Sequence, residues 1–200
     1  MARPRRQEER RADLVDATLA AVSERGLRAL SLTDVAAKAG LTRGAILYYY
    51  DDLDALLLET HRAGVERFCD RRDAIVAAIP EPPRQLAAAI REGLPSGPDD
   101  ALMRLLYEFD VLAGTSSLHD QLVEQLYRRQ LATYADILGR GVASGAFAPV
   151  MAVDVAAMNL VALEDAYGLH IVGGNSLITV ASAEAAMREA ARAFGASVDC

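Results

Sequence analysis

The segment from Ser31 to Tyr50 constrains the fold more than any other part of the chain. It opens with Ser31-Leu32-Thr33-Asp34, which has the form of a capping box at the start of a helix. That helix, over residues 32–39, is followed by Gly40, which permits a positive φ, and by Thr42, which can cap a second helix over residues 43–49. Two short helices joined by a glycine-containing turn predict a helix-turn-helix.

The flanking segments complete an N-terminal head. Apolar residues at helical spacing predict a helix over about residues 7–25, closed by Gly26, with residues 1–6 as a basic, mobile arm. After the helix-turn-helix, a long helix is expected from residue 52 or 53 toward Ile79, where a proline-rich segment stops it. We therefore place the domain boundary between residues 1–51 and residues 52–200.

The remaining sequence predicts further helices and no sheet. Alanine and leucine dominate while β-branched and aromatic residues are few. Glycine and proline punctuation divides this part into helices over about residues 84–94, 99–113, 117–144, 154–172 and 182–194. The expected fold is all-α, with a three-helix head on a body of roughly six helices.

Charge is distributed unevenly along the chain. The net charge is −7, but residues 1–50 carry nine basic and six acidic side chains, so this segment is +3 and the remainder is −10. A basic head on an acidic body favours contact with DNA through one face. The two cysteines, Cys69 and Cys200, form no metal-spaced pair and are expected to be inert, and neither a signal peptide nor a membrane-spanning run is evident. A cytoplasmic protein without membrane association is expected.

The segment from about Arg10 to Leu58, including "ALSLTDVAAKAGLTRGAILYYYDDLDALL", resembles the TetR family of repressors. The residues that carry the resemblance share fixed spacing with the family pattern: Val35, Ala36, Ala39, Gly40, Leu41, Thr42, Gly44, Leu47, Tyr48 and Tyr50. The closing segment "AAMNLVALEDAYGLHIVGGN" is similar to the BetI-like subgroup. One departure is Leu53, where family members commonly place a lysine that contacts phosphate. The resemblance implies a ligand-responsive regulator that binds palindromic duplex DNA as a homodimer.

In this architecture the helix that begins at Arg43 enters the major groove. Arg43 is expected to contact guanine, Gly44 permits close approach, and Ala45 suits a thymine methyl group. Hydroxyl-bearing residues and Lys38 are expected to hold phosphates. The full set predicted to bind DNA is Ser31, Thr33, Lys38, Thr42, Arg43, Gly44, Ala45, Tyr48 and Tyr49. Tyr50 is expected in the core, and a solvated Arg43 is the alternative to a base contact.

The last two helices are the predicted dimer interface, because the apolar helix near residues 154–172 must be buried on more than one side. Burial within one protomer is the alternative. The body is expected to bind a small effector, and acids beside aromatic rings favour a cationic one. Candidate lining residues are polar groups within apolar helices: His61, Tyr107, Glu108, Asp110, Tyr127, Asn159, Glu164, Asp165, Tyr167 and His170. For each acid, solvation or pairing with arginine is the alternative.

Other function classes have less support in the sequence. His61, His119 and His170 with scattered acids could form an acid–base or metal site, but no hydrolase, zinc or phosphate-loop motif is present. We therefore expect no enzyme activity, no metal and no cofactor. A corepressor-dependent or effector-independent regulator remains the alternative within the DNA-binding class.

Overall fold

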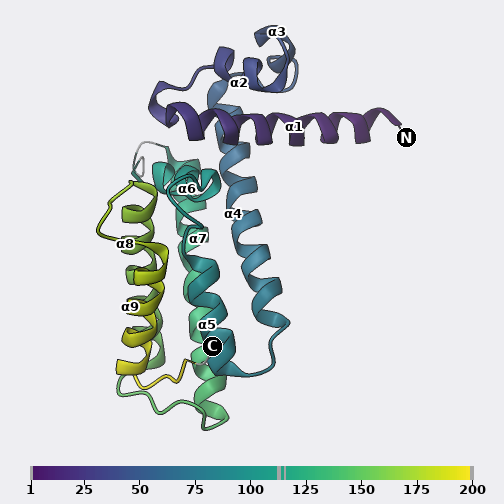
Figure 1. Cartoon of the computed structure of the whole chain (residues 1–200). Coiled ribbons are helices and arrows are strands. Elements are labelled where there is room, and N and C mark those ends of the chain that lie inside the picture. Colours follow the sequence, from purple (N-terminus) through teal and green to yellow (C-terminus); the bar gives the residue numbers. More distant parts are fainter. Residues whose placement is uncertain (1, 112–113, 115, 199–200) are drawn as a thin grey trace. The chain divides into compact units, whose positions relative to one another are not determined.

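The computed structural model describes residues 2–111, 114 and 116–198, and over these residues it contains helices and no strand. The elements are α1 (Ala2–Arg25), the short 3₁₀ helix η1 (Leu27–Ala29), α2 (Leu32–Ala39), α3 (Arg43–Ile46), α4 (Leu53–Ala77), α5 (Pro82–Gly93), α6 (Ala101–Val111), α7 (Ser117–Ala143), α8 (Val153–Val172) and α9 (Val180–Ala193) (Figure 1). The all-α prediction is confirmed. Met1, Ala113 and Cys200, on which expectations above fall, lie outside the described residues.

Local signals set most helix ends in the head. The Ser31 hydroxyl accepts the Asp34 N–H while the Asp34 carboxylate accepts the Ser31 N–H, so the predicted capping box is present. Gly26 and Gly40 adopt φ of 73° and 64°, which place them in the region that favours glycine at a helix end. At the start of α4, Asp52 accepts the N–H of Ala55, so this carboxylate caps a helix.

Two helix ends predicted for the N-terminal head differ from the structure. The first helix begins at Ala2, so residues 2–6 are helical rather than an irregular arm. Pro4 is compatible with this because the first backbone N–H groups of a helix have no intrahelical partner. The second helix of the helix-turn-helix, α3, ends at Ile46 rather than at Tyr49, because the N–H groups of Tyr49 and Tyr50 both bond to the carbonyl of Ile46 and tighten the chain into a turn.

The chain forms two compact units. The first comprises Met1–Glu66 and Ala101–Val123, and the second comprises Arg67–Asp100 and Glu124–Cys200. The first unit thus contains α6 in addition to the helix-turn-helix, while α4 and α7 each contribute to both units. This grouping by packing does not test the expected domain boundary after residue 51, which stays a prediction.

Each unit has its own hydrophobic core. In the first, Leu14 and Val22 of α1 lie with Val35 of α2, Ile46 of α3 and Phe109 of α6. The expected core residue Tyr50 is 4% exposed and belongs to this cluster, with the Arg11 guanidinium 4.7 Å from its ring centroid.

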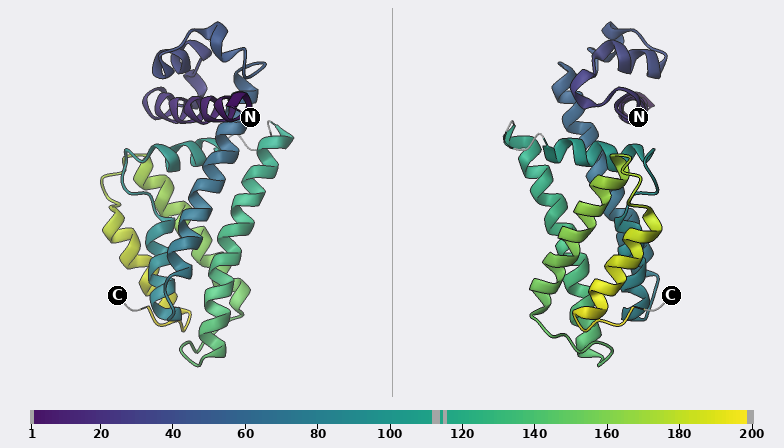
Figure 2. Two further views of the ribbon diagram at one scale, coloured as in Figure 1. Left: turned by 90° about the vertical axis from the view of Figure 1, so that its right-hand side faces the viewer. Right: turned by 60° about the vertical axis from the view of Figure 1, so that its left-hand side comes forward.

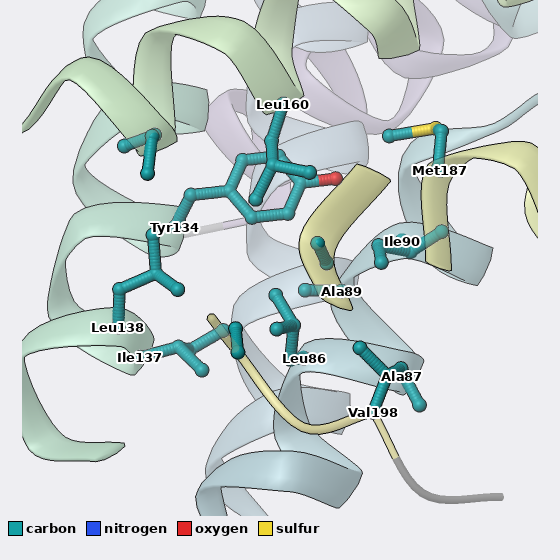
Figure 3. Close-up of a cluster of buried hydrophobic side chains, with 14 of the residues drawn as sticks. Leu86, Ala87, Ala89, Ile90, Tyr134, Ile137, Leu138, Leu160, Met187 and Val198 are labelled. Carbon is teal, nitrogen blue, oxygen red and sulfur yellow. The ribbon is translucent and has the colours of Figure 1, made fainter. Parts of the chain in front are cut away.

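The core of the second unit is built from α5, α7, α8 and α9. Figure 3 shows Leu86 and Ile90 of α5, Tyr134 and Ile137 of α7, Leu160 of α8 and Met187 of α9. Helices α8 and α9 pack side by side in this unit, as both views of Figure 2 show in green and yellow.

Helix α8 is long and apolar enough to pass a length-and-composition test for a membrane span. It carries the fully buried Glu164 in its middle, however, and its Leu160 and Val161 are fully buried in the core. These features are those of a core helix, which passes the same test.

Candidate DNA interface and effector site

The helix-turn-helix presents most of its predicted contact residues to solvent. Thr33, Thr42, Arg43, Gly44 and Tyr48 are exposed, and Tyr48 keeps 67% of its surface accessible. Thr33 lies in the first turn of α2, Arg43 and Gly44 belong to α3, and Thr42 and Tyr48 lie just before and just after α3. The arrangement provides a compact exposed surface that combines one cation with hydroxyl groups.

Several of these residues also have local roles in the fold. The Thr42 hydroxyl accepts the N–H of Ala45 at 3.2 Å, which caps α3. The Ser31 hydroxyl is bonded to Asp34 at 2.6 Å, and the Lys38 ammonium pairs with Glu24 of α1. Tyr49 is half-buried and meets the Tyr48 ring edge-on at 5.1 Å. Ser31 and Lys38 would therefore exchange an existing partner for a phosphate.

Arg43 is the exposed cation at the first position of α3. Within the described part of the chain no ion pair to it is found. Leu53, which replaces the lysine expected from the TetR resemblance, is partly buried and packs against the core of the first unit. The substitution thus adds apolar packing at the position where the family commonly has a cation.

The residues predicted to bind an effector are divided between the two units. His61, Tyr107, Glu108 and Asp110 belong to the first, whereas the second contains Tyr127, Asn159, Glu164, Asp165, Tyr167 and His170. The structure brings some members of each set together with residues that the sequence did not single out. Whether any of them contacts an effector stays a prediction.

In the first unit, His61 lies against Phe109 and His119, and we call these three residues the aromatic cluster. The rings of His61 and Phe109 stack with their centroids 4.0 Å apart, and the ring centroids of Phe109 and His119 are 4.6 Å apart. The Nδ1 atoms of the two histidines are 3.0 Å apart, so one ring donates a hydrogen bond to the other. His61 is fully buried, and its Nε2 atom has no hydrogen-bond partner.

Burial sets the protonation of this cluster. Loss of solvation, with a smaller contribution from His119, lowers the pKa of His61 to about 3, so this ring is neutral near pH 7. On α6, burial raises the pKa of Asp110 to about 6. Also on α6, the Glu108 carboxylate accepts the N–H of Leu27, and Tyr107 is buried.

In the second unit, Glu164 is the centre of a group that we call the buried polar cluster: Arg72, Gln130, Tyr134 and Glu164. The Arg72 guanidinium donates to both carboxylate oxygens of Glu164, at 3.1 and 2.8 Å. Gln130 and the Tyr134 hydroxyl donate at 2.8 and 2.6 Å. Four hydrogen bonds fill the acceptor capacity of one carboxylate, so an effector would have to displace one of these groups to reach Glu164.

The electrostatics of the cluster keep Arg72 charged and Tyr134 neutral. Burial acts to lower the pKa of Arg72, but attraction to Glu164 and the contact with Tyr134 outweigh it and raise the pKa. Burial and the adjacent Glu164 raise the pKa of Tyr134 well above its usual value, so the hydroxyl remains a donor. The guanidinium also lies 4.7 Å from the Tyr134 ring centroid and 5.9 Å from that of Phe68.

The other candidates of the second unit are more accessible. Tyr127 is 38% exposed, Asn159 and His170 are exposed on α8, and Tyr167 is partly buried. Asp165 is partly buried and accepts a hydrogen bond from Gln130 at 3.3 Å. Cys69 is 3% exposed, and burial raises the pKa of its thiol to about 11, which agrees with the expected inert role.

Comparison with known proteins supports the sequence pattern. Residues 14–60 match the model for bacterial regulatory proteins of the tetR family, which spans the helix-turn-helix described above. This match assigns the helix-turn-helix segment, residues 14–60, to the tetR family. It is 23% identical over 146 residues to the transcriptional repressor KstR2 of Mycobacterium tuberculosis, a match that covers 73% of each protein. It is 34% identical over 124 residues to the regulator BetI of Yersinia pestis, which covers 60% of this chain and 59% of BetI.

The fold of this chain also matches solved structures. A transcriptional regulator from Saccharomonospora viridis, solved in complex with choline, superposes with a TM-score of 0.85 at 21% identity. The match covers 92% of this chain and 96% of that one. At this identity the likeness establishes the shared fold.

Proposed function

We propose that this chain is a TetR-family regulator, a cytoplasmic, homodimeric repressor that binds a palindromic duplex operator and is released by a small effector. The observation that carries the DNA-binding part is the exposed surface of α2 and α3, with Arg43 at the first position of the recognition helix. Arginine at that position suits a bidentate contact to guanine O6 and N7. A corepressor-dependent or effector-independent regulator is the second candidate.

DNA binding is tested by selecting duplexes from a random pool and footprinting the enriched sequence. Arg43→Ala should weaken binding to the selected duplex by about 1–3 kcal/mol and relax the base preference at one position of each half-site. Arg62→Ala removes the same charge from an exposed position of α4 and is the control for general electrostatics. Equal losses in the two variants, with unchanged base preference, would contradict the assignment of Arg43 to base recognition.

A dimer is supported by the surface of α8. Val155, Met158 and Leu169 are 46%, 51% and 49% exposed and, at helical spacing, lie on one side of the helix. A second copy of this face would cover them, and a two-fold dimer would place two recognition helices on successive major grooves. Met158→Asp should shift the mass measured by light scattering from dimer to monomer. Val142→Asp, a similar change at a 39% exposed position of α7, should leave the mass unchanged.

The effector is proposed to be cationic. Support comes from the acids and aromatic rings among the candidate residues and from the choline complex of the Saccharomonospora viridis regulator. A thermal-shift screen should show stabilisation by amines and quaternary ammonium compounds. Stabilisation by neutral or anionic compounds alone would refute the cationic class. Loss of the footprint on addition of the stabilising compound indicates induction, whereas a footprint gained indicates corepression.

A further inference from the structure

The three rings of the aromatic cluster are nearly parallel. The planes of His61 and Phe109 meet at 7°, those of Phe109 and His119 at 16°, and those of the two histidines at 17°. Rings stacked on opposite faces of Phe109 would lie about 7 Å apart or more, because each stacked contact separates two planes by about 3.5 Å. The histidine centroids are only 5.3 Å apart. The two imidazoles therefore lie side by side on one face of Phe109, with their Nδ1 atoms 3.0 Å apart.

This arrangement allows two assignments of the ring hydrogens. A neutral imidazole has one N–H donor and one acceptor nitrogen, so only one of the facing Nδ1 atoms carries a hydrogen. Either His61 donates from Nδ1 and its Nε2 is an acceptor, or His119 donates and His61 carries its hydrogen on Nε2. In the second case a fully buried N–H has no acceptor among the described residues.

The charges around His119 favour the first assignment. Burial lowers the pKa of His119, while the nearby Asp54 and Asp120 act to raise it. Within the described residues, the charge that acts on His61 comes from His119 alone, so the two carboxylates lie nearer to His119. A negative field on that side stabilises an N–H group there and destabilises a lone pair. His119 thus carries its hydrogen on Nε2 and accepts from His61 through Nδ1.

The Nε2 atom of His61 is consequently a buried acceptor. It points away from His119, because the two nitrogens of an imidazole ring are directed to opposite sides, and no described residue donates to it. A group that donates to this nitrogen makes a hydrogen bond in a site that has already lost its solvation. The same burial disfavours positive charge beside the ring, since it lowers the pKa of His61 to about 3. The donor that fits is therefore neutral.

We propose that the Nε2 atom of His61 selects an effector that carries a neutral O–H or N–H donor. This inference rests on the proposed function, because it concerns the small effector of that regulator. Any cationic centre of the effector lies elsewhere in the bound compound. A compound of similar size without the donor leaves the buried nitrogen unpaired, and binding sites discriminate strongly against analogues of that kind.

The first test is the tautomer of the histidines in the wild-type protein. It is measured by ¹⁵N NMR of the side chains at about pH 8, where both rings are neutral. His61 should carry its hydrogen on Nδ1 and His119 on Nε2. A hydrogen on Nε2 of His61 would make that atom a donor and would overturn the proposal.

The second test compares pairs of compounds that differ only in the replacement of a hydroxyl by a methoxy group. Tyramine and its methyl ether are the cationic pair, and phenethyl alcohol and its methyl ether are the uncharged pair. The hydroxyl member of at least one pair should bind about tenfold more tightly than its ether in calorimetry. The same compound should shift the ¹⁵N resonance of His61 Nε2. Absence of binding by both hydroxyl compounds, or an unchanged Nε2 resonance, would refute the proposal.

Two variants separate the hydrogen bond from the size of the ligand. His61→Phe keeps a planar ring without the nitrogen and should abolish the preference for the hydroxyl compound. His170→Phe makes the same replacement at an exposed position of α8 and should retain the preference. A preference that persists in His61→Phe would come from the smaller size of the alcohol and would contradict the role of His61. The NMR measurements use the wild-type protein and do not depend on the folding of either variant.

Footprinting of the selected duplex tests the proposed function independently. An effector that releases the duplex but contains no O–H or N–H donor would leave the proposed function intact and overturn the role of His61. If the wild-type protein selects no duplex, the proposed function fails, and the acceptor at His61 is judged separately by the tautomer and by the binding of the paired compounds.

Discussion

The buried polar cluster makes a quantitative prediction about stability. Arg72 and Glu164 are 1% and 0% exposed, and the guanidinium is the only cation among the groups bonded to that carboxylate in the described chain. Arg72→Met would leave Glu164 buried with two neutral donors, Gln130 and Tyr134. Breaking a buried pair by removing one partner destabilises a protein by about 3–5 kcal/mol. For a chain of this length that corresponds to roughly 10 °C in Tm.

The double variant Arg72→Met with Glu164→Gln separates the charge effect from lost packing. Glutamine keeps an oxygen that can accept from Tyr134, and no unpaired charge remains. We expect it to be more stable than either single variant, with a coupling energy of about 2–4 kcal/mol measured by urea unfolding. The same cycle on Arg128 and Glu124, which are 73% and 61% exposed and bonded at 2.6 Å, should give less than about 0.5 kcal/mol. Additive losses at the buried pair would refute the reasoning.

Three further predictions use single positions. Gly93→Ala places a Cβ atom 2.2 Å from a Glu164 oxygen and should lower Tm. Gly139→Ala, in α7 with open space around it, should instead stabilise the protein by about 0.5–1 kcal/mol. A higher Tm for Gly93→Ala than for Gly139→Ala would contradict this packing. With Cys200 replaced by serine, Cys69 should resist alkylation at pH 8 until urea unfolds the protein, because burial raises the pKa of its thiol to about 11. Rapid modification of the folded protein would contradict that burial. Burial lowers the pKa of His61 to about 3, so between about pH 6.5 and pH 3 the unfolded chain binds a proton that the folded protein does not, and the free energy of unfolding falls as the pH decreases. His61→Phe should therefore reduce the loss of unfolding free energy between pH 7 and pH 5 by about 2 kcal/mol. An unchanged loss would mean that another group takes up the proton.

The helix-turn-helix was predictable because its signals are local. The capping box at Ser31 and Asp34, the left-handed turns at Gly26 and Gly40 and the cap at Thr42 each depend on residues within four positions of one another. Because these contacts depend on neighbouring residues and not on how distant segments pack, they can be predicted from the spacing of residues along the sequence. The TetR-family pattern, read from the same segment, agrees with the family match over residues 14–60.

Local signals were less reliable at helix ends without a strong cap. The first helix reaches back to Ala2 because a proline such as Pro4 is tolerated in the first turn of a helix, and α3 ends at Ile46 without a glycine or proline that fixes the stop. Propensity changes only gradually from residue to residue there, and the hydrogen bonds of the turn decide the boundary.

The sequence by itself determined that this protein is all-helical, that residues 31–50 form a helix-turn-helix, and which of its side chains are candidates for DNA contact. Only the tertiary structure decided that α6 belongs to the DNA-binding unit, that Glu108 holds Leu27, that His61 faces His119, and that Glu164 is neutralised by Arg72. The last three contacts join residues 81, 58 and 92 positions apart. At such separations spacing along the chain carries no information about proximity, and the partners of a buried polar group are set by how the helices pack.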